Sequence, residues 1–342
     1  MKKTLIALAT LAAATGAMAQ SSVTIKGTFD PSLVSQKNTY GNGNSVTQTG
    51  LQNNRQGTSQ ITFLGTEDLG GGLKANFLYE GDFNATQQAG TANGIGNGGG
   101  EVFVGLSGGF GSLKLGSPNT PTLTAQTASN PFGTKIGSGF GAMNSGKVRN
   151  NSTIRFDTPS FSGFSAAIAY STQTKADTNP TNRVAAAGAH TDIGLSYANG
   201  PLVVGYSNYK VAGVGAAASN TLNNAYVTYD LGVAKLGAGY FTEKDGAAAS
   251  ASVVSGATNS QAYNLSVSVP MGAVTLMANY GKKNDKAAAN NDRTVTAVGA
   301  KYDLSKRTSA YARFVTDKTD GTVNAVLAAK STYTIFGLQH NF

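Results

Sequence analysis

The side chains that could carry out acid, base or metal chemistry are few in this sequence and widely separated. The chain has 342 residues, with no cysteine and only two histidines, His190 and His340. His190 and Asp192 are spaced as neighbours on one face of a strand, which favours a polar pair in a wall, because metal sites need clustered ligands at fixed spacing. Glu67 and Asp68 are adjacent, so in a strand they would point to opposite faces. The sequence therefore predicts neither an enzyme nor a bound metal or cofactor.

One long polar stretch, residues 118–148, needs a different explanation. It holds three prolines, several glycines, Lys135 and Lys147, but no acidic residue and no strand or helix periodicity. A run of about 30 residues without secondary structure is uncommon in a compact domain unless the loop has a function. We interpret it as a constriction loop that folds into a water-filled β-barrel and narrows it.

Charged residues on and around this loop are candidates for the lining of such a channel. They are Lys135 and Lys147 on the loop, and Lys26, Asp30, Lys74, Glu80, Glu101, Lys114, Arg149, Arg155 and Asp157 around it. Lining charges select ions at close range in a wide pore. Because the loop has no acid, we expect a weak to moderate preference for anions. In the alternative interpretation, several of these charges pair with neighbours or bind lipopolysaccharide.

The loop also contains apolar side chains that could hold it against the wall of the barrel. They are Phe132, Ile136, Phe140 and Met143. We expect these side chains to pack against Leu64 and Leu78. The glycines of the loop permit a close approach to the wall, and its prolines stiffen it.

The N-terminus has the composition of a secretory signal. Two lysines are followed by an apolar segment, residues 4–14, and by the small-residue cleavage site at residues 17–19. Residues 1–19 are therefore expected to be removed, leaving residues 20–342 as one mature domain. No later stretch is apolar enough to cross a bilayer as a helix. A membrane form of the mature chain would have to be a barrel.

The remainder of the chain alternates between strand-like segments and turns. Only 13% of the residues are charged, well below the ~25% of a soluble protein. In residues 153–158, Arg155 and Asp157 share one face and Ile154 and Phe156 the other. About seven short turns alternate with eight long polar stretches, which indicates 16 antiparallel strands around an aqueous lumen. A soluble sandwich would show the same periodicity.

Aromatic residues and the chain ends support the barrel. Seven tyrosines fall on the lipid-facing side of their strands near strand ends, where aromatic girdles belong. They are Tyr170, Tyr197, Tyr229, Tyr240, Tyr263, Tyr280 and Tyr302. Residues 331–342 are expected to pair with residues 22–35 and so remove both edges of the sheet.

Arginine does not cluster with aromatic residues, which argues against a nucleic-acid partner.

Five motifs resemble those of Gram-negative trimeric general porins of the β-proteobacterial type. They are GTEDLGGGLK at residues 65–74, VGLSGGFG at 104–111, RFDTPSFSGF at 155–164, YDLSKRT at 302–308 and the ending GLQHNF at 337–342. The motifs occur in order and span the whole mature chain. The resemblance is therefore specific, although each motif alone is modest.

The resemblance implies an all-β protein, a 16-stranded antiparallel transmembrane β-barrel in the outer membrane with its third loop folded inward. It implies a homotrimer that lets small hydrophilic solutes and anions diffuse passively, with residues 84–100 latched onto a neighbouring subunit. Phe342 would end the assembly signal of the family. The partners implied are outer-membrane lipids, lipopolysaccharide, periplasmic chaperones and the barrel-assembly machinery.

The sequence departs from the family at the expected constriction. Family members commonly carry basic residues at positions that here are Gln60, Leu64, Gly100 and Ser117, and the loop has Asn-Pro-Phe-Gly at residues 130–133 in place of Pro-Glu-Phe-Gly. These departures weaken the expected field across the constriction. An outer-membrane lipid hydrolase, a secreted adhesive β-protein and a substrate-specific channel are the competing interpretations.

Overall fold

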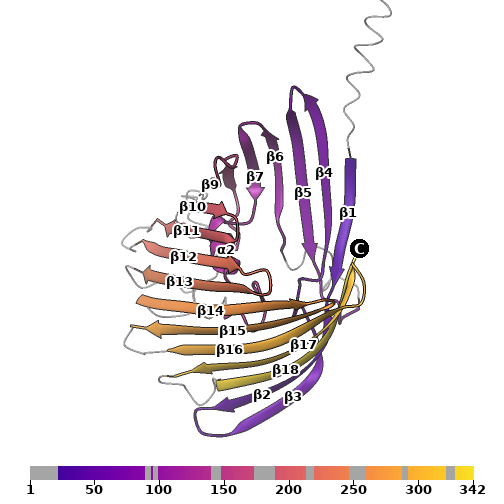
Figure 1. Cartoon of the computed structure of the whole chain (residues 1–342), viewed down its shortest axis with the longest axis vertical. Helices are drawn as coiled ribbons and strands as arrows, with labels where there is room; N and C mark the ends of the chain where they lie inside the picture. Colours follow the sequence, from indigo (N-terminus) through magenta and orange to yellow (C-terminus); the bar gives the residue numbers. More distant parts are fainter. Residues whose placement is uncertain are drawn as a thin grey trace, which may run out of the picture.

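The computed structural model describes residues 22–88, 94, 99–139, 148–172, 189–212, 219–245, 259–286, 292–320 and 328–342. The expected signal peptide, residues 1–19, lies outside them. Over the described residues the chain is an antiparallel sheet with one short helix, α2 (Pro121–Ala128) (Figure 1). The strands are β1 (Ser22–Phe29), β2 (Pro31–Tyr40), β3 (Ser45–Asn53), β4 (Gln60–Gly70), β5 (Leu73–Asp82), β6 (Val102–Gly108), β7 (Gly111–Ser117), β8 (Thr153–Asp157), β9 (Phe164–Ser171), β10 (His190–Asn199), β11 (Leu202–Val211), β12 (Asn220–Asp230), β13 (Lys235–Asp245), β14 (Asn259–Met271), β15 (Val274–Asp285), β16 (Arg293–Asp303), β17 (Thr308–Thr319) and β18 (Ala328–Asn341).

The sheet closes on itself through its first and last strands. β1 pairs with β4 along one edge, and on its other edge Thr28 lies opposite Asn341 and Phe29 opposite His340 of β18. β2 continues the pairing with β18, from Ser32 opposite Gly337 onward. The expected closure between the two ends of the chain is therefore confirmed. Since β1 and β2 form one bent strand, and β3 and β4 another, the eighteen segments make a closed 16-stranded barrel.

The first strand bends at Asp30, which the sequence indicated as a candidate lining charge and not as a bend. The Asp30 carboxylate is fully buried and accepts hydrogen bonds from the Gln56 and Gly57 amides, at 2.6 and 2.8 Å, and from the Tyr311 hydroxyl at 2.6 Å. These bonds fix residues 54–59, which interrupt the second strand between β3 and β4. The first of the eight long polar stretches in the sequence is residues 36–58, which were expected to form a loop. That prediction was wrong, because most of them form the hairpin of β2 and β3.

Apolar side chains cover one face of the strands, as the alternation of side chains along a strand requires. Six of the seven predicted girdle tyrosines are between 38 and 49% exposed, together with leucines, valines and phenylalanines of the same register. Tyr197 is half-buried because its ring packs on Phe164, with centroids 4.5 Å apart. Arg155, Asp157, Asp192 and Asn264 lie in the other register, which we call the opposite face.

Short turns join most of the strands at one end of the barrel. Gly70, Gly71 and Gly72 have φ between +60° and +85°, a conformation that costs glycine little. Asp68 and Asp230 each accept the amide two residues later through Oδ1, at 2.9 and 2.8 Å, which is the usual Asx-turn bond. The Gly- and Asp-rich segments that predicted turns do form them.

Candidate functional site

A helix forms within residues 118–148, although the sequence showed no helical stripe there. Thr120 is its N-cap: the hydroxyl accepts the Leu123 amide at 3.1 Å, and Pro121 occupies the first turn. Thr followed by Pro is a common helix start, because the hydroxyl satisfies an orphan amide and proline has none to satisfy. The prediction of a structureless loop was therefore wrong for residues 121–128. Thr120 followed by Pro121 is the sequence signal that would have predicted this helix.

Buried polar side chains of β10, β11 and β12 hold α2 against the sheet. The Asp192 carboxylate accepts the Thr122 amide at 2.9 Å and the Thr122 hydroxyl at 2.8 Å. The Thr122 hydroxyl lies 3.1 Å from that of Ser207, and Gln126 donates to Asn224 at 3.4 Å. In Figure 1, α2 accordingly lies beside β10, β11 and β12. Asp192 was expected to pair with His190, but it is an anchor for the helix.

The turn that follows α2 is bound through its backbone to β14 and β15. The Ser129 carbonyl accepts hydrogen bonds from the Asn264 amide group at 2.9 Å and from the Ser266 hydroxyl at 2.6 Å. The Asn279 amide group donates to the Gly137 carbonyl at 3.0 Å. A Cβ atom on Gly237 would come within 2.6 Å of the Ser129 carbonyl oxygen, so only glycine allows this approach.

Phe132 is the apolar centre of the contact between this segment and the sheet. It is 2% exposed and packs in a cluster with Phe241, Ala262, Val295, Ala297 and Val315, from β13 to β17. Ile136 adjoins the same cluster. The prediction that these two residues pack on Leu64 and Leu78 was wrong, because those leucines line a cavity with residues of β4 to β7. Phe140 and Met143 lie outside the described residues.

Arg313 on β17 joins three parts of the chain at this cluster. It is 4% exposed, and its guanidinium lies 4.8 Å from the centre of the Phe132 ring. Its Nη1 donates to the carbonyls of Arg55 and Ile136, at 2.6 and 3.1 Å. The buried charge is thus held by carbonyl oxygens and an aromatic face. Arg313 was not among the predicted site residues, because nothing in the pattern of β17 distinguishes it from the other residues that face away from lipid.

The two ends of residues 118–148 meet a charged network on β5 to β8. Glu101 accepts two hydrogen bonds from Asn119, from the backbone amide and the side-chain amide, both at 3.0 Å. Arg149 donates to the Asn119 side-chain oxygen at 2.9 Å and to the Gly99 carbonyl at 3.1 Å. Arg155 donates to the Asn119 carbonyl. Three predicted site residues therefore converge on Asn119.

Asp157 extends this network toward the turns. It pairs with Arg155, with Nη2 and Oδ1 2.6 Å apart, and with Lys114 at 3.5 Å. Lys114 also lies 5.1 Å above the Phe103 ring. Arg155 and Asp157 lie on one face of their strand, as their spacing predicted, and there they form an ion pair. Each charge is at most about one-quarter exposed, so the pair is screened less than a surface pair.

The other predicted site residues are placed apart from this network. Lys135 donates to the Thr58 hydroxyl at 2.5 Å, and burial lowers the pKa of its ammonium group, although Asp30 and Asp82 partly oppose the shift. Lys74 is exposed beside the turn between β4 and β5. Lys147 lies outside the described residues. Phe342 exchanges two 3.1 Å backbone hydrogen bonds with Gly27 on the first strand.

The histidines do not assemble a reactive site. His190 Nδ1 lies 2.5 Å from the Tyr209 hydroxyl, and His340 Nδ1 lies 2.9 Å from the Thr308 hydroxyl. Across the described part of the chain, His, Asp and Glu residues form no group of three able to hold a metal. No helix among the described residues is long and apolar enough to cross a membrane.

Comparison with known proteins gives matches over nearly the whole chain. Residues 4–322 match the protein family described as Gram-negative porin. The chain is 34% identical over 350 residues to the outer membrane porin protein 32 of Delftia acidovorans, covering 97% of this chain and 94% of that protein. It is 31% identical over 339 residues to the major outer membrane protein P.IB of Neisseria gonorrhoeae, covering 91% and 92%. The solved anion-selective porin from Comamonas acidovorans has a TM-score of 0.77 and 29% identity, covering 94% of this chain and 100% of that one.

Proposed function

The chain belongs to the Gram-negative porin family and is an outer-membrane channel rather than an enzyme, and on this premise we propose how its pore is narrowed. In this proposal the opposite face of the barrel lines a water-filled lumen. Residues 118–148 fold into that lumen and form the constriction through which small hydrophilic solutes and ions diffuse.

The binding of residues 119–138 to the opposite face is the observation that carries this proposal. The helix and the following turn contact side chains that alternate with the exposed, lipid-facing ones on the same strands. In a closed barrel such side chains point to the interior. Hydrogen bonds from Asp192, Asn264 and Asn279, with the Phe132 cluster, would hold the segment across the lumen against thermal motion.

We also propose a weak to moderate preference for anions. The formal net charge is +9 for the whole chain and +7 without the two lysines of residues 1–19 (9 − 2). Of the lining candidates, Lys114, Lys135, Arg149 and Arg155 lie at or near the segment. Asp157 pairs with Lys114 and Arg155, which limits the preference. The relative from Comamonas acidovorans is described as anion-selective. The roles of Lys74 and Lys147 at the constriction remain predictions.

The assembly of the channel is proposed from the family. A homotrimer is the expected state, with residues 84–100 reaching a neighbouring subunit. Cleavage of residues 1–19, contact with lipopolysaccharide, and delivery by chaperones to the barrel-assembly machinery through the Phe342 ending are further predictions. The backbone pairing of Phe342 with Gly27 gives this ending a place in barrel closure.

A salt-gradient recording tests the proposed selectivity. The purified protein is inserted into a planar bilayer with KCl at two concentrations, and the reversal potential is measured. We expect a potential of the sign given by chloride as the more permeant ion. A potential of the opposite sign would overturn the anion preference, and a lack of discrete conductance steps would contradict the channel itself.

A further inference from the structure

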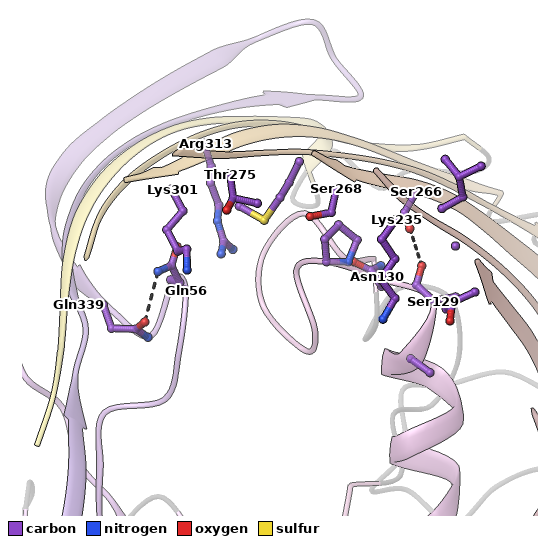
Figure 2. A pocket seen from close by; sticks show the side chains of 16 residues that line it. Gln56, Ser129, Asn130, Lys235, Ser266, Ser268, Thr275, Lys301, Arg313 and Gln339 are labelled. Carbon is purple, nitrogen blue, oxygen red and sulfur yellow. Dashed lines mark hydrogen bonds between the residues drawn. The ribbon is translucent and has the colours of Figure 1, made fainter. Parts of the chain in front are cut away.

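A cavity of about 390 Å³ lies between the turn after α2 and the strands β12 to β18 (Figure 2). We call it the lysine pocket. Its lining includes Lys235, Lys301 and Arg313, with Gln56 and Gln339 on one side and Ser129 and Asn130 on the other. None of its lining residues is acidic. The pocket belongs to neither the charged network around Asn119 nor the predicted set of site residues.

The register of the strands separates the two lysines and places hydroxyl groups between them. Lys235 lies opposite Ser268 on β14, and Lys301 lies opposite Thr275 on β15. β13 and β16 are three strands apart, or roughly 14 Å at the usual strand spacing. Lysine side chains are long enough to reach toward each other over much of that distance. A ligand with negative charge at both ends would contact both ammonium groups.

The charge of the pocket is only partly neutralised. Lys301 pairs with Asp303 at 3.0 Å. Asp230 lies opposite Lys235 in the strand register, but no carboxylate among the described residues is within 4.0 Å of the Lys235 ammonium group. Arg313 adds a buried charge whose Nη1 is held by two carbonyl oxygens. Figure 2 shows Lys301 beside Gln56 and Arg313, and Lys235 beside Ser129. An anion entering the pocket therefore meets excess positive charge from two sides.

We propose that the lysine pocket transiently binds small multivalent oxyanions as they pass through the channel. This inference rests on the proposed function, because it requires the opposite face to line the lumen. Negatively charged oxygen atoms would accept hydrogen bonds from the ammonium groups of Lys235 and Lys301 and from the hydroxyls of Ser268 and Thr275. Charge-assisted bonds of this kind are stronger than neutral ones, so two-ended anions are retained and monovalent ones are not.

The pocket also has a defined place along the channel. Lys235 is the first residue of β13, Thr275 the second of β15 and Lys301 the third from the end of β16, so all three lie next to the short turns. The turn end of a barrel of this class faces the periplasm. Ser129, Asn130 and Pro131 of the proposed constriction border the pocket. Bound anions would therefore dwell on the periplasmic side of the constriction.

Pyrophosphate block of single channels tests the proposal. The intact channel is recorded in KCl while inorganic pyrophosphate is added on the turn side, and the concentration that halves the current is measured. In Lys235→Gln/Lys301→Gln we expect this concentration to rise about tenfold, because both charge-assisted contacts are lost. For each single variant, the pyrophosphate concentration that halves the current should lie between the values for the wild type and the double variant.

The matched control is Lys306→Gln/Arg307→Gln, which removes two charges from an exposed turn at the same end of the barrel. The half-blocking pyrophosphate concentration of this control should stay within about twofold of the wild-type value, since salt screening weakens the effect of distant exposed charges. Citrate serves as a second probe: block at similar concentrations extends the ligand class to carboxylates, and weaker block restricts it to phosphates. Acetate should not block.

Two results would overturn the inference. One is no block of the wild-type channel by pyrophosphate, and the other is an equal loss of block in the pocket variant and the turn control. The reversal potential in KCl alone separates this failure from that of the proposed function. A channel that prefers chloride but ignores pyrophosphate would contradict only the pocket.

Discussion

Two halves of the barrel wall bind residues 119–138 and Arg149 in different ways. The half from β10 to β18 uses the carboxylate of Asp192, the buried guanidinium of Arg313, neutral amides and hydroxyls, and the apolar cluster around Phe132. The half from β5 to β8 uses Glu101, Arg149, Arg155 and Asp157, which meet the ends of the segment at Asn119. The first half binds the helix and the turn after it at many buried points, so we expect it to set their position. In the proposed function, the second half places charge beside the ends of the constriction segment, so we expect it to contribute to ion selectivity.

Removing Phe132 should have the largest effect on the position of the segment. Replacing a buried phenylalanine by alanine costs about 3–5 kcal/mol, because apolar contacts are lost and a cavity remains. Phe132→Ala should therefore release the turn, and single-channel conductance should rise with added current noise. Phe161→Ala, on a side chain 79% exposed at a turn, is the control and should leave the traces unchanged. Wild-type traces from Phe132→Ala would refute the role of the cluster.

Weakening the Asp192 anchor should have a smaller effect of the same kind. Asp192→Asn leaves one acceptor oxygen for two donors on Thr122 and brings an amide group toward one of them, at a cost of about 1–3 kcal/mol. We expect brief open-channel excursions at an unchanged main conductance. Asp230→Asn, in an exposed turn, should show none. If both variants flicker equally, the helix is not held by Asp192.

Removing a charge from the half of the wall from β5 to β8 should change the ion selectivity of the channel and leave its conductance unchanged. Arg155→Gln removes a cation next to the segment and leaves Asp157 less neutralised, so the anion-to-cation permeability ratio should fall by about twofold. The reversal potential in a KCl gradient measures it, with Arg307→Gln as the control in an exposed turn. A large rise in conductance for Arg155→Gln would show that this half also sets position.

Lys135 gives the smallest expected effect, through pH. Burial lowers the pKa of its ammonium group, so as pH rises Lys135 loses its charge before exposed lysines do. The anion preference should weaken first in the alkaline range, and Lys135→Met should abolish this early component of the change. Reversal potentials recorded at increasing pH test this, and an identical pH profile for Lys135→Met would exclude Lys135 as the group responsible.

The sequence predicted the barrel wall well because each strand carries its own pattern. The register of Arg155 and Asp157 follows from the cost of placing charge against lipid. The exposed tyrosines on the other register follow from the aromatic girdles that such barrels carry at the membrane interfaces. Closure by the last strand followed from the need to remove edges. These features are local or depend on the chain ends alone.

Contacts between distant segments were not predictable from the same patterns. The bend at Asp30 depends on amides 26 and 27 residues away and on Tyr311. Phe132 could have met any apolar patch on the opposite face, and the sequence offered Leu64 and Leu78 as readily as Phe241 and Val315. Arg313 carries no local signal because its partners are backbone carbonyls on two separate segments.

A designed disulfide tests most directly whether α2 sits against the wall inside the assembled channel. The natural chain has no cysteine, and the hydroxyls of Thr122 and Ser207 are 3.1 Å apart. Thr122→Cys/Ser207→Cys should therefore cross-link on mild oxidation and keep the wild-type conductance. Ser165→Cys/Ser196→Cys, whose hydroxyls are 2.7 Å apart on neighbouring strands, controls for oxidation within the wall. Cross-linking of the wall pair without cross-linking of the helix pair, in channels that conduct normally, would contradict the account.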